Sequence, residues 1–282
     1  MKSTTSEYTL TVYVYPSPYG IDWSSPKNLT RTAIRNQFNR IGRSIGHIHI
    51  EIKSPQKQIL TGMIQKSKIE ERKLLFLDQI GFGILLHSFK GALETTEDIL
   101  KELERRKTKI GKLSFIRFLI SKNTFDRLEQ YLNEYKNTDL HYGLPNRPRY
   151  LEGAGCTAYA TSFLEVGGIL LDELKTHWAN QVRIPVSLLG GRYHPENKKC
   201  PLWKLALLSN SVKWAGIGEK QETVHFWDPD RMHSWIIEKW NSIQSSSEFV
   251  ATEFVVTQDG LAKGLVFDAT QYPTPVEPIW KK

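Results

Sequence analysis

The stretch "HIHIEI", residues 47–52, alternates polar and aliphatic side chains, and the interpretation of the whole chain depends on it. Successive side chains of a β-strand point to opposite faces of the sheet. The three isoleucines therefore share one face, which suits a hydrophobic core, while His47, His49 and Glu51 share the other. Two imidazoles and a carboxylate on one face can bind a metal, form a catalytic centre or simply meet solvent.

The composition is that of an ordinary globular protein. The chain has 282 residues, of which 40% are hydrophobic and 24% are charged, so it can bury the core of one large domain or two small ones. No run approaches the roughly 18 apolar residues of a membrane span. Residues 1–17 lack the apolar segment of a secretory signal. We therefore expect no membrane span. No leader is visible in the chain as it stands, and the localisation stays open.

The charge and the cysteines exclude some classes of protein. The formal net charge of +8 favours acidic partners. The most charged stretches, residues 66–73 and 101–112, mix both signs, which is typical of solvated helix faces. Because zinc-finger, RNP-like and basic-zipper patterns are also missing, we expect no nucleic-acid partner. The two cysteines, Cys156 and Cys200, are too few for a disulfide framework.

Apolar periodicity predicts a succession of strands and helices. Strands are expected at residues 8–17, 47–54, 59–66, 81–91 and 112–121, a strand followed by a turn at 182–191, and a hairpin within 248–269. Helices are expected at residues 28–41, 66–79, 95–107, 121–137, 156–168 and 228–243. Thr95 or Thr96 and Asp228 suit the N-cap positions of two helices, and Pro229 suits a first helical position. Hairpins mixed with helices favour an α+β fold over a doubly wound parallel sheet.

The stretch "YLEGAGCTAYATSFLEVGG", residues 150–168, carries the clearest chemical signal. Gly153 and Gly155 precede Cys156, which opens the predicted helix. Small residues let a substrate backbone approach, and a helix N-terminus offers N–H groups and a positive dipole end that favour the thiolate. Those N–H groups can also hold an oxyanion. Cys156 is therefore the candidate nucleophile, with a buried small hydrophobe as the structural alternative, whereas Cys200 lies in no such setting.

These motifs resemble the circularly permuted papain-like thiol hydrolases, which are related to NlpC-like cell-wall amidases and to lecithin retinol acyltransferase-like enzymes. The resemblance rests on "GHIHIEI" followed, after a helix-rich stretch, by "GAGCTAYATSFLEV", with histidine before cysteine as in the permuted branch. It implies an α+β, papain-like antiparallel sheet packed with helices. The catalytic core would be residues 1–172, and residues 173–282 would be a C-terminal extension without a counterpart.

The resemblance also implies the chemistry. Cys156 matches the nucleophile and His47 the base of a cysteine peptidase, amidase or acyl transferase that acts on an amide or ester bond through an acyl-enzyme. The two side chains are expected near hydrogen-bonding distance, about 3 to 4 Å apart. The substrate would be a peptide, a peptidoglycan-type glycopeptide or a lipid acyl group, and no cofactor would be required. His49 could replace His47 as the base or contact the substrate.

A third polar residue usually orients the imidazole in this family. If the hairpin after residue 52 turns around Gln56, Gln65 lies opposite His47 and Thr61 opposite Glu51. Gln65 is then the expected third catalytic residue, and Glu51 is the fallback. A shift of the register by one residue would remove this assignment.

Other readings of the polar residues remain open. His49 and Glu51 also fit a His-x-His-x-Glu metal pattern, as in a metal-dependent enzyme, but no later cluster has a convincing spacing, so we expect no metal. The stretch "HFWDPDRMH", residues 225–233, is a second metal candidate, although Asp228 is better explained as a helix cap. His87 is best explained as a buried histidine with satisfied hydrogen bonds. A non-catalytic binding protein that retains the fold is a further alternative.

Residues 173–282 show no linker, charge run or independent motif. Domains are usually separated by flexible polar or Pro/Gly-rich segments. We therefore expect this extension to pack on the core and to form one wall of the cleft, with its tryptophans restricting the substrate. The sequence carries no signal for an oligomeric state.

Overall fold

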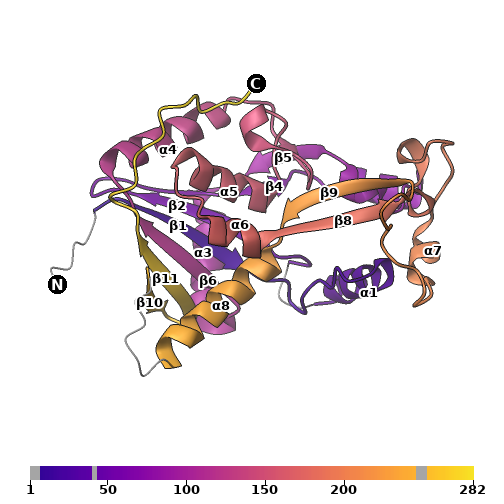
Figure 1. Ribbon diagram of the computed structural model, residues 1–282, viewed down its shortest axis with the longest axis horizontal. Helices are drawn as coiled ribbons and strands as arrows, with labels where there is room; N and C mark the ends of the chain where they lie inside the picture. The colour runs from indigo at the N-terminus through magenta and orange to yellow at the C-terminus, as the bar shows by residue number, and fades with distance from the viewer. Residues whose placement is uncertain (1–6, 40–42, 246–252) are drawn as a thin grey trace.

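A six-stranded sheet runs through the centre of the molecule (Figure 1). The computed structural model describes residues 7–39, 43–245 and 253–282. The strand order is β10-β11-β6-β1-β2-β3, and neighbouring strands are antiparallel except for the parallel pair β6 and β11. These strands are β1 (Thr9–Tyr15), β2 (His47–Lys53), β3 (Gln58–Thr61), β6 (Ser114–Leu119), β10 (Phe254–Asp259) and β11 (Ala262–Asp268). The fold is mixed α+β with mainly antiparallel sheets, as predicted.

Two smaller sheets and eight α-helices complete the described part of the chain. One small sheet contains β4 (Met63–Gln65), β5 (Phe89–Leu93) and β7 (His141–Tyr142), and the other contains β8 (Ala179–Pro185) and β9 (Gln221–Trp227). The helices are α1 (Pro26–Gln37), α2 (Ile69–Phe76), α3 (Thr96–Arg105), α4 (Lys122–Tyr135), α5 (Cys156–Val166), α6 (Asp172–Trp178), α7 (Leu202–Ala206) and α8 (Pro229–Ser245).

The isoleucine face of β2 forms part of the main hydrophobic core. Ile48, Ile50 and Ile52 pack there with residues of α4 and α5, the helices that cover this face of the sheet in Figure 1. Each isoleucine is at most 1% exposed, and burying such a side chain contributes about 1.5–3 kcal/mol. This burial fixes the strand register, because a shift by one residue would turn the isoleucines away from the helices.

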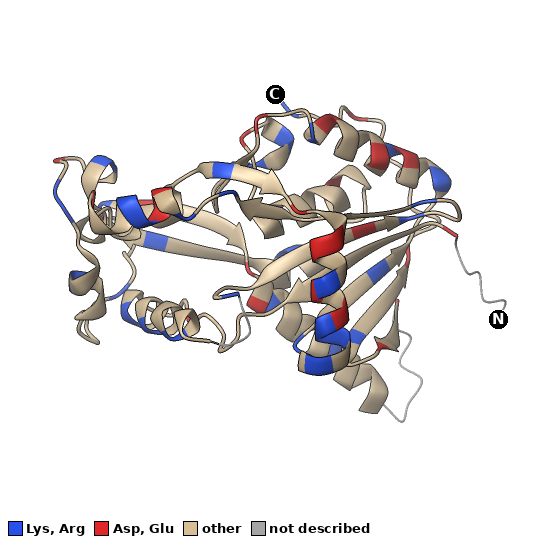
Figure 2. Ribbon diagram, turned by 180° about the vertical axis from the view of Figure 1, so that it is seen from behind, with Lys and Arg blue, Asp and Glu red and all other residues tan. Residues whose placement is uncertain are grey.

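The histidine face of β2 is buried as well. His47 and His49 lie beside Tyr15 of β1, and both are almost fully buried, with exposed fractions of 3% and 0%. Helix α3 covers this side of the sheet, and the view from behind in Figure 2 shows basic and acidic residues alternating along its ribbon. Solvent exposure therefore does not explain the two imidazoles.

The C-terminal region contributes directly to the central sheet and to its core. β11 pairs with β6, and Trp178 and Trp235 lie in the same hydrophobic cluster as the isoleucines of β2. Helix α8 begins at Pro229, and the carboxylate of Asp228 accepts a 2.9 Å hydrogen bond from the backbone N–H of Asp230, as expected for an N-cap.

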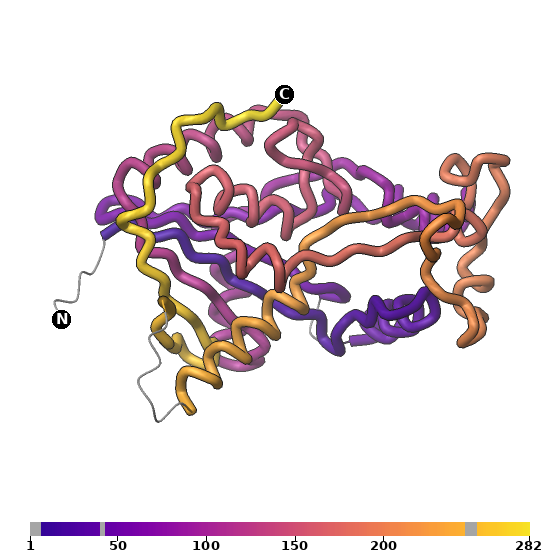
Figure 3. The backbone as a smooth tube through the Cα atoms, viewed as in Figure 1, coloured from indigo at the N-terminus to yellow at the C-terminus, as the bar shows by residue number. Residues whose placement is uncertain are grey.

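A second hydrophobic cluster packs α1, the strands β8 and β9, and α7 against one another. The two-stranded sheet of β8 and β9 extends from α6 towards α7, and α1 lies alongside it (Figure 3). Leu29 of α1 packs there with Val182 and Ile184 of β8 and with Leu205 of α7.

Two predicted strands differ from the structure. Residues 81–91 form a 3₁₀-helix over Phe82–Leu86 before β5 begins, and Gly81 has a φ of 55°, which extended backbone does not adopt. Residues 59–66 split at Gly62 into β3 of the central sheet and β4 of a small sheet. This split moves the second half of the predicted hairpin away from β2.

In the described part of the chain, no helix combines the length and the apolar character that spanning the hydrocarbon layer of a membrane requires.

Candidate functional site

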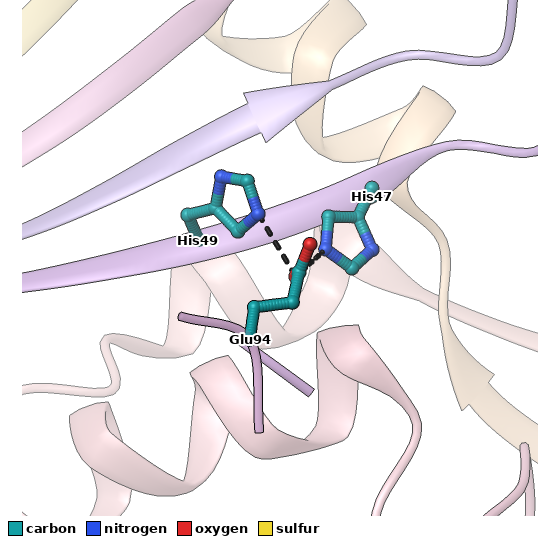
Figure 4. A group of neighbouring side chains, drawn as sticks. All are labelled: His47, His49 and Glu94. Atoms are coloured by element: carbon teal, nitrogen blue, oxygen red, sulfur yellow. Dashed lines mark hydrogen bonds and ion pairs between the residues drawn. The ribbon is translucent and has the colours of Figure 1, made fainter. Parts of the chain in front are cut away.

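Three buried side chains converge at the start of β2 (Figure 4). Nε2 of His47 lies 2.5 Å from Oε2 of Glu94, and Nε2 of His49 lies 2.9 Å from the same oxygen. The three side chains are at most 5% exposed. Both imidazoles come from β2 at positions i and i+2, and Glu94 directly follows β5. The histidines therefore share one face, as predicted, but their partner is Glu94.

The backbone around Gly62 brings Glu94 to the histidines. The N–H of Glu94 donates a 2.9 Å hydrogen bond to the carbonyl oxygen of Gly62. A Cβ atom at Gly62 would lie 2.6 Å from Oε2 of Glu94 and 2.6 Å from Cδ2 of His49. Real Cβ contacts are longer than this, so the position requires glycine for the cluster to close.

Two further residues bind the outer edges of the cluster. Nη2 of Arg43 lies 2.5 Å from Oε1 of Glu94, and the Tyr15 hydroxyl lies 2.8 Å from Nδ1 of His49. Because an ionised Glu94 only accepts hydrogen bonds, both Nε2 atoms must donate to it. Nδ1 of His49 then accepts from the Tyr15 hydroxyl. This assignment follows from the hydrogen-bond network.

The electrostatics of the cluster favour neutral imidazoles and an ionised carboxylate. Burial, helped by the positive charge of Arg43, lowers the pKa of His47 to about 3. Burial also lowers the pKa of His49. Burial opposes ionisation of Glu94, but hydrogen bonds from the two histidines outweigh it and hold the pKa of this carboxyl well below its usual range.

Cys156 opens helix α5, as predicted, with Gly155 at the N-cap. Its side chain is buried, and burial raises the pKa of the thiol, although the Tyr142 hydroxyl and the charge of Arg43 both favour the thiolate. The Tyr142 hydroxyl lies near the sulfur, and each group influences the ionisation of the other. Burial and the nearby Cys156 raise the pKa of Tyr142, so its hydroxyl stays protonated.

The sulfur of Cys156 lies at the edge of β2. The backbone N–H of Ile48 lies near the sulfur and favours the thiolate, at a position that β3 does not reach because the pairing of β2 with β3 ends at Ile50. The sulfur is therefore beside the peptide bond that joins His47 to Ile48. Among the described residues, no hydrogen bond links the sulfur to either imidazole.

The expected hydrogen bond between Cys156 and His47 is thus not found among the described residues. The ring of His47 is bonded through Nε2 to Glu94, whereas the sulfur lies near the Ile48 N–H and the Tyr142 hydroxyl. Within the part of the chain that the structure describes, Nδ1 of His47 takes part in no hydrogen bond. That nitrogen keeps a lone pair, because Nε2 carries the proton of the neutral ring.

Gln65 is not placed where the sequence predicted. β2 and β3 pair with Ile50 opposite Thr61, one residue away from the predicted register, and Gln65 lies in β4, paired with Gly91 of β5. Its side-chain amide donates to the carbonyl of Ser67. The hairpin assumption was therefore wrong, because the chain turns at Gly62 and leaves the central sheet.

Glu51 shares the predicted face of β2 but makes different contacts. Its carboxylate accepts a 2.7 Å hydrogen bond from the Tyr13 hydroxyl and another from the side-chain amide of Gln58. Among the described residues, no hydrogen bond or ion pair joins it to the histidines. Glu94 takes the place that was considered for Glu51 and Gln65.

The sequence offered almost no signal for Glu94, Arg43 or Tyr142. Glu94 is 45 positions from His49, and it lies at the end of a strand whose partner was predicted incorrectly. Arg43 is one of many basic residues, and its ion pair with Glu94 spans 51 positions. Long-range pairing of this kind leaves no periodic trace.

The other histidines that were considered have structural partners. His87 contacts the Tyr193 hydroxyl at 2.7 Å and Glu70 at 3.0 Å, as expected for a buried histidine with satisfied hydrogen bonds. His233 bonds the Ser114 hydroxyl at 2.8 Å. In residues 7–39, 43–245 and 253–282, the one group of His, Cys, Asp or Glu with ligand atoms close enough for a metal ion is His47, His49 and Glu94, with all atoms within 4.8 Å of one another.

A pocket of about 300 Å³ lies along the outer side of α5. Its lining includes Thr161 and Glu165 of α5, Trp227 of β9 and Arg147, but not Cys156 or His47. The C-terminal region thus supplies a tryptophan to a pocket beside the helix that carries the cysteine.

Comparisons with known proteins do not identify a family. No model of a known protein family matches the chain, no curated protein sequence matches it, and no solved structure matches it.

Proposed function

We propose that this protein is a cysteine-dependent hydrolase or acyl transferase of the circularly permuted papain-like kind, and that it acts on an amide or ester bond. The observation that carries the proposal is the position of the Cys156 sulfur. It lies at the N-terminus of α5 and beside the peptide that follows His47, whose ring Glu94 holds through Nε2.

In this proposal His47 is the base and Glu94 its positioning residue. The lone pair on Nδ1 of His47 takes the thiol proton when substrate enters. The carboxylate of Glu94 and the new thiolate then stabilise the imidazolium of His47. This stabilisation raises the pKa of His47, whose ring is neutral in the resting site. Glu94 takes the role that the resemblance assigned to Gln65.

The covalent steps follow from these positions. The thiolate of Cys156 attacks the carbonyl carbon, and the resulting oxyanion accepts a hydrogen bond from the Tyr142 hydroxyl, which lies near the sulfur. The imidazolium of His47 returns its proton to the leaving group, and an acyl-enzyme remains. Water or another acceptor then releases the acyl group. Peptides, glycopeptides and lipid acyl groups all fit this chemistry.

The test compares the two cysteines of the chain in one experiment. Cys200 is also buried, at 1% exposed against 6% for Cys156, so it serves as an internal control for access. At neutral pH, iodoacetamide should modify Cys156 at least about tenfold faster than Cys200, as mass spectrometry of the peptides would show. Replacing His47 by alanine should remove most of this difference.

Equal and slow modification of both cysteines in the folded protein would contradict the proposal. A folded protein with an inert Cys156 would instead favour a binding protein that keeps the fold without turnover. Circular dichroism of each variant establishes that the fold is intact in either case.

A further inference from the structure

We propose that His47, His49 and Glu94 also form a binding site for a divalent transition-metal ion of the zinc class, and that the bound ion suppresses the chemistry of Cys156. Metal binding stands on the geometry of the cluster alone. The suppression rests on the proposed function.

The spacing of the three ligand atoms suits a small ion. Zinc bonds to nitrogen and oxygen are about 2.0–2.1 Å long, so two ligands of a tetrahedral ion are about 3.3 Å apart. The Nε2 atoms lie 2.5 Å (His47) and 2.9 Å (His49) from Oε2 of Glu94, and the whole group fits within 4.8 Å. A shift of less than about 1 Å in the carboxylate therefore opens the site to an ion.

The protons of the cluster can rearrange when an ion binds. Both imidazoles are buried, and in the hydrogen-bond network each ring has its proton on Nε2 and its lone pair on Nδ1. The ion takes the Nε2 lone pair, and the ring proton moves from Nε2 to Nδ1. In His49, Nδ1–H then donates to the Tyr15 hydroxyl, which changes from donor to acceptor within the same 2.8 Å contact.

The same proton shift explains the suppression. In His47 the proton that arrives on Nδ1 occupies the lone pair that would accept the thiol proton of Cys156. The imidazole then has no free nitrogen, because the ion holds the other one. A metal-bound cluster therefore cannot act as the base, although the thiol itself is unchanged.

Arg43 sets the strength of the site. Its guanidinium binds Oε1 of Glu94, and the ion needs only Oε2, so both can be present together. The positive charge of Arg43 nevertheless opposes a second cation. Replacing Arg43 by glutamine should tighten zinc binding, which is the opposite of what loss of a ligand would do.

The binding experiment uses the 282-residue protein with the substitution Cys156→Ala, which removes the thiol as a ligand. Calorimetric titration with Zn²⁺, and the visible absorption of Co²⁺, should show one ion per chain. His49→Gln should weaken binding more than about tenfold, and Tyr15→Phe should weaken it about tenfold through the orientation of His49. His87→Gln is the matched control, because it alters a buried histidine with its own carboxylate partner, and it should bind as the parent does.

Three results would overturn the metal site. The first is that Zn²⁺ does not bind stoichiometrically, and the second is that His49→Gln and His87→Gln weaken Zn²⁺ binding equally. The third is that Zn²⁺ binds to the wild type but not to Cys156→Ala. The last result would make the sulfur a ligand. Thermal melting without metal, recorded for each variant, separates lost ligands from lost structure.

The suppression is tested on the wild type. Zn²⁺ should slow the iodoacetamide reaction of Cys156 about tenfold or more, a chelator should restore it, and Co²⁺ should show no thiolate charge-transfer band. A reactive Cys156 with no metal binding defeats only this inference. Metal binding to a protein whose Cys156 is inert without metal defeats only the proposed function. Metal binding with unchanged reactivity contradicts the suppression.

Discussion

Nε2 of His47 lies 2.5 Å from Oε2 of Glu94, although the two residues are 47 positions apart in the chain. This contact joins β2 of the central sheet to the end of β5. It engages Nε2 of His47 in a hydrogen bond and leaves Nδ1 with its lone pair. Both the proposed chemistry and the metal site depend on it.

The contact predicts a large loss of stability when Glu94 changes. Glu94→Gln leaves Arg43 without its carboxylate and gives the two imidazoles only one neutral oxygen, so the free energy of unfolding should fall by about 3 kcal/mol. Denaturant unfolding measures it. Gln65→Ala, at the position that the register excludes, should change stability by less than about 0.5 kcal/mol. Similar values for the two variants would contradict this account of the cluster.

Gly62 offers a second way to disturb the same contact. Gly62→Ala places a methyl group 2.6 Å from Glu94 and from His49, so it should reduce stability by about 1–3 kcal/mol and lower the reactivity of Cys156. Gly216→Ala is the matched control, because its nearest neighbour would be 3.9 Å away on the side chain of Glu219. If both variants melt as the wild type does, the close approach is not required.

The thiol of Cys156 should respond to loss of the Tyr142 hydroxyl. This hydroxyl favours the thiolate, so Tyr142→Phe should shift the pKa of the thiol further upward, and alkylation at a fixed neutral pH should slow. The ultraviolet absorbance of the thiolate, followed against pH, measures the shift. Tyr150→Phe, at an exposed position, should leave the titration of the thiol unchanged. A downward shift in Tyr142→Phe would contradict the assigned direction.

His233 predicts a pH dependence of stability that does not involve the site. Burial, with the nearby charges of Lys112 and Arg106, lowers its pKa to about 4. Between roughly pH 6.5 and pH 4 the unfolded chain binds a proton that the folded chain does not, so stability falls as the pH falls, by up to about 1.4 kcal/mol per pH unit. In His233→Asn this part of the slope should disappear. Unfolding curves of both proteins across this pH range give the difference, and parallel slopes would refute the prediction.

A truncation tests the role of the C-terminal region. A chain that ends after Asp172 loses β11, the partner of β6, and with it Trp178, Trp235 and other core residues. It should expose apolar surface and fail to show a cooperative melting transition. The truncated chain could instead be soluble, melt cooperatively and keep the full reactivity of Cys156. That result would show that residues 173–282 are an independent appendage.

The sequence by itself determined most of the local structure. Alternation predicted β2 and placed His47 and His49 on one face, because the period of a strand follows from backbone geometry alone. Capping chemistry located the starts of α3 and α8, with Thr95 and Asp228 at their caps. The thiol at the start of α5 was found in the same way, from the glycines before Cys156.

Only the tertiary structure decided what surrounds the histidines. The turn at Gly62, the register of β3 and the approach of β5 depend on how distant segments pack, and no local pattern reports them. These features excluded Gln65 and brought Glu94 and Arg43 to the imidazoles. The same packing buried the polar face of β2 beneath α3, so that the histidines became a closed, charge-balanced cluster. Periodicity shows which way a side chain points, whereas its partner is set by long-range contacts.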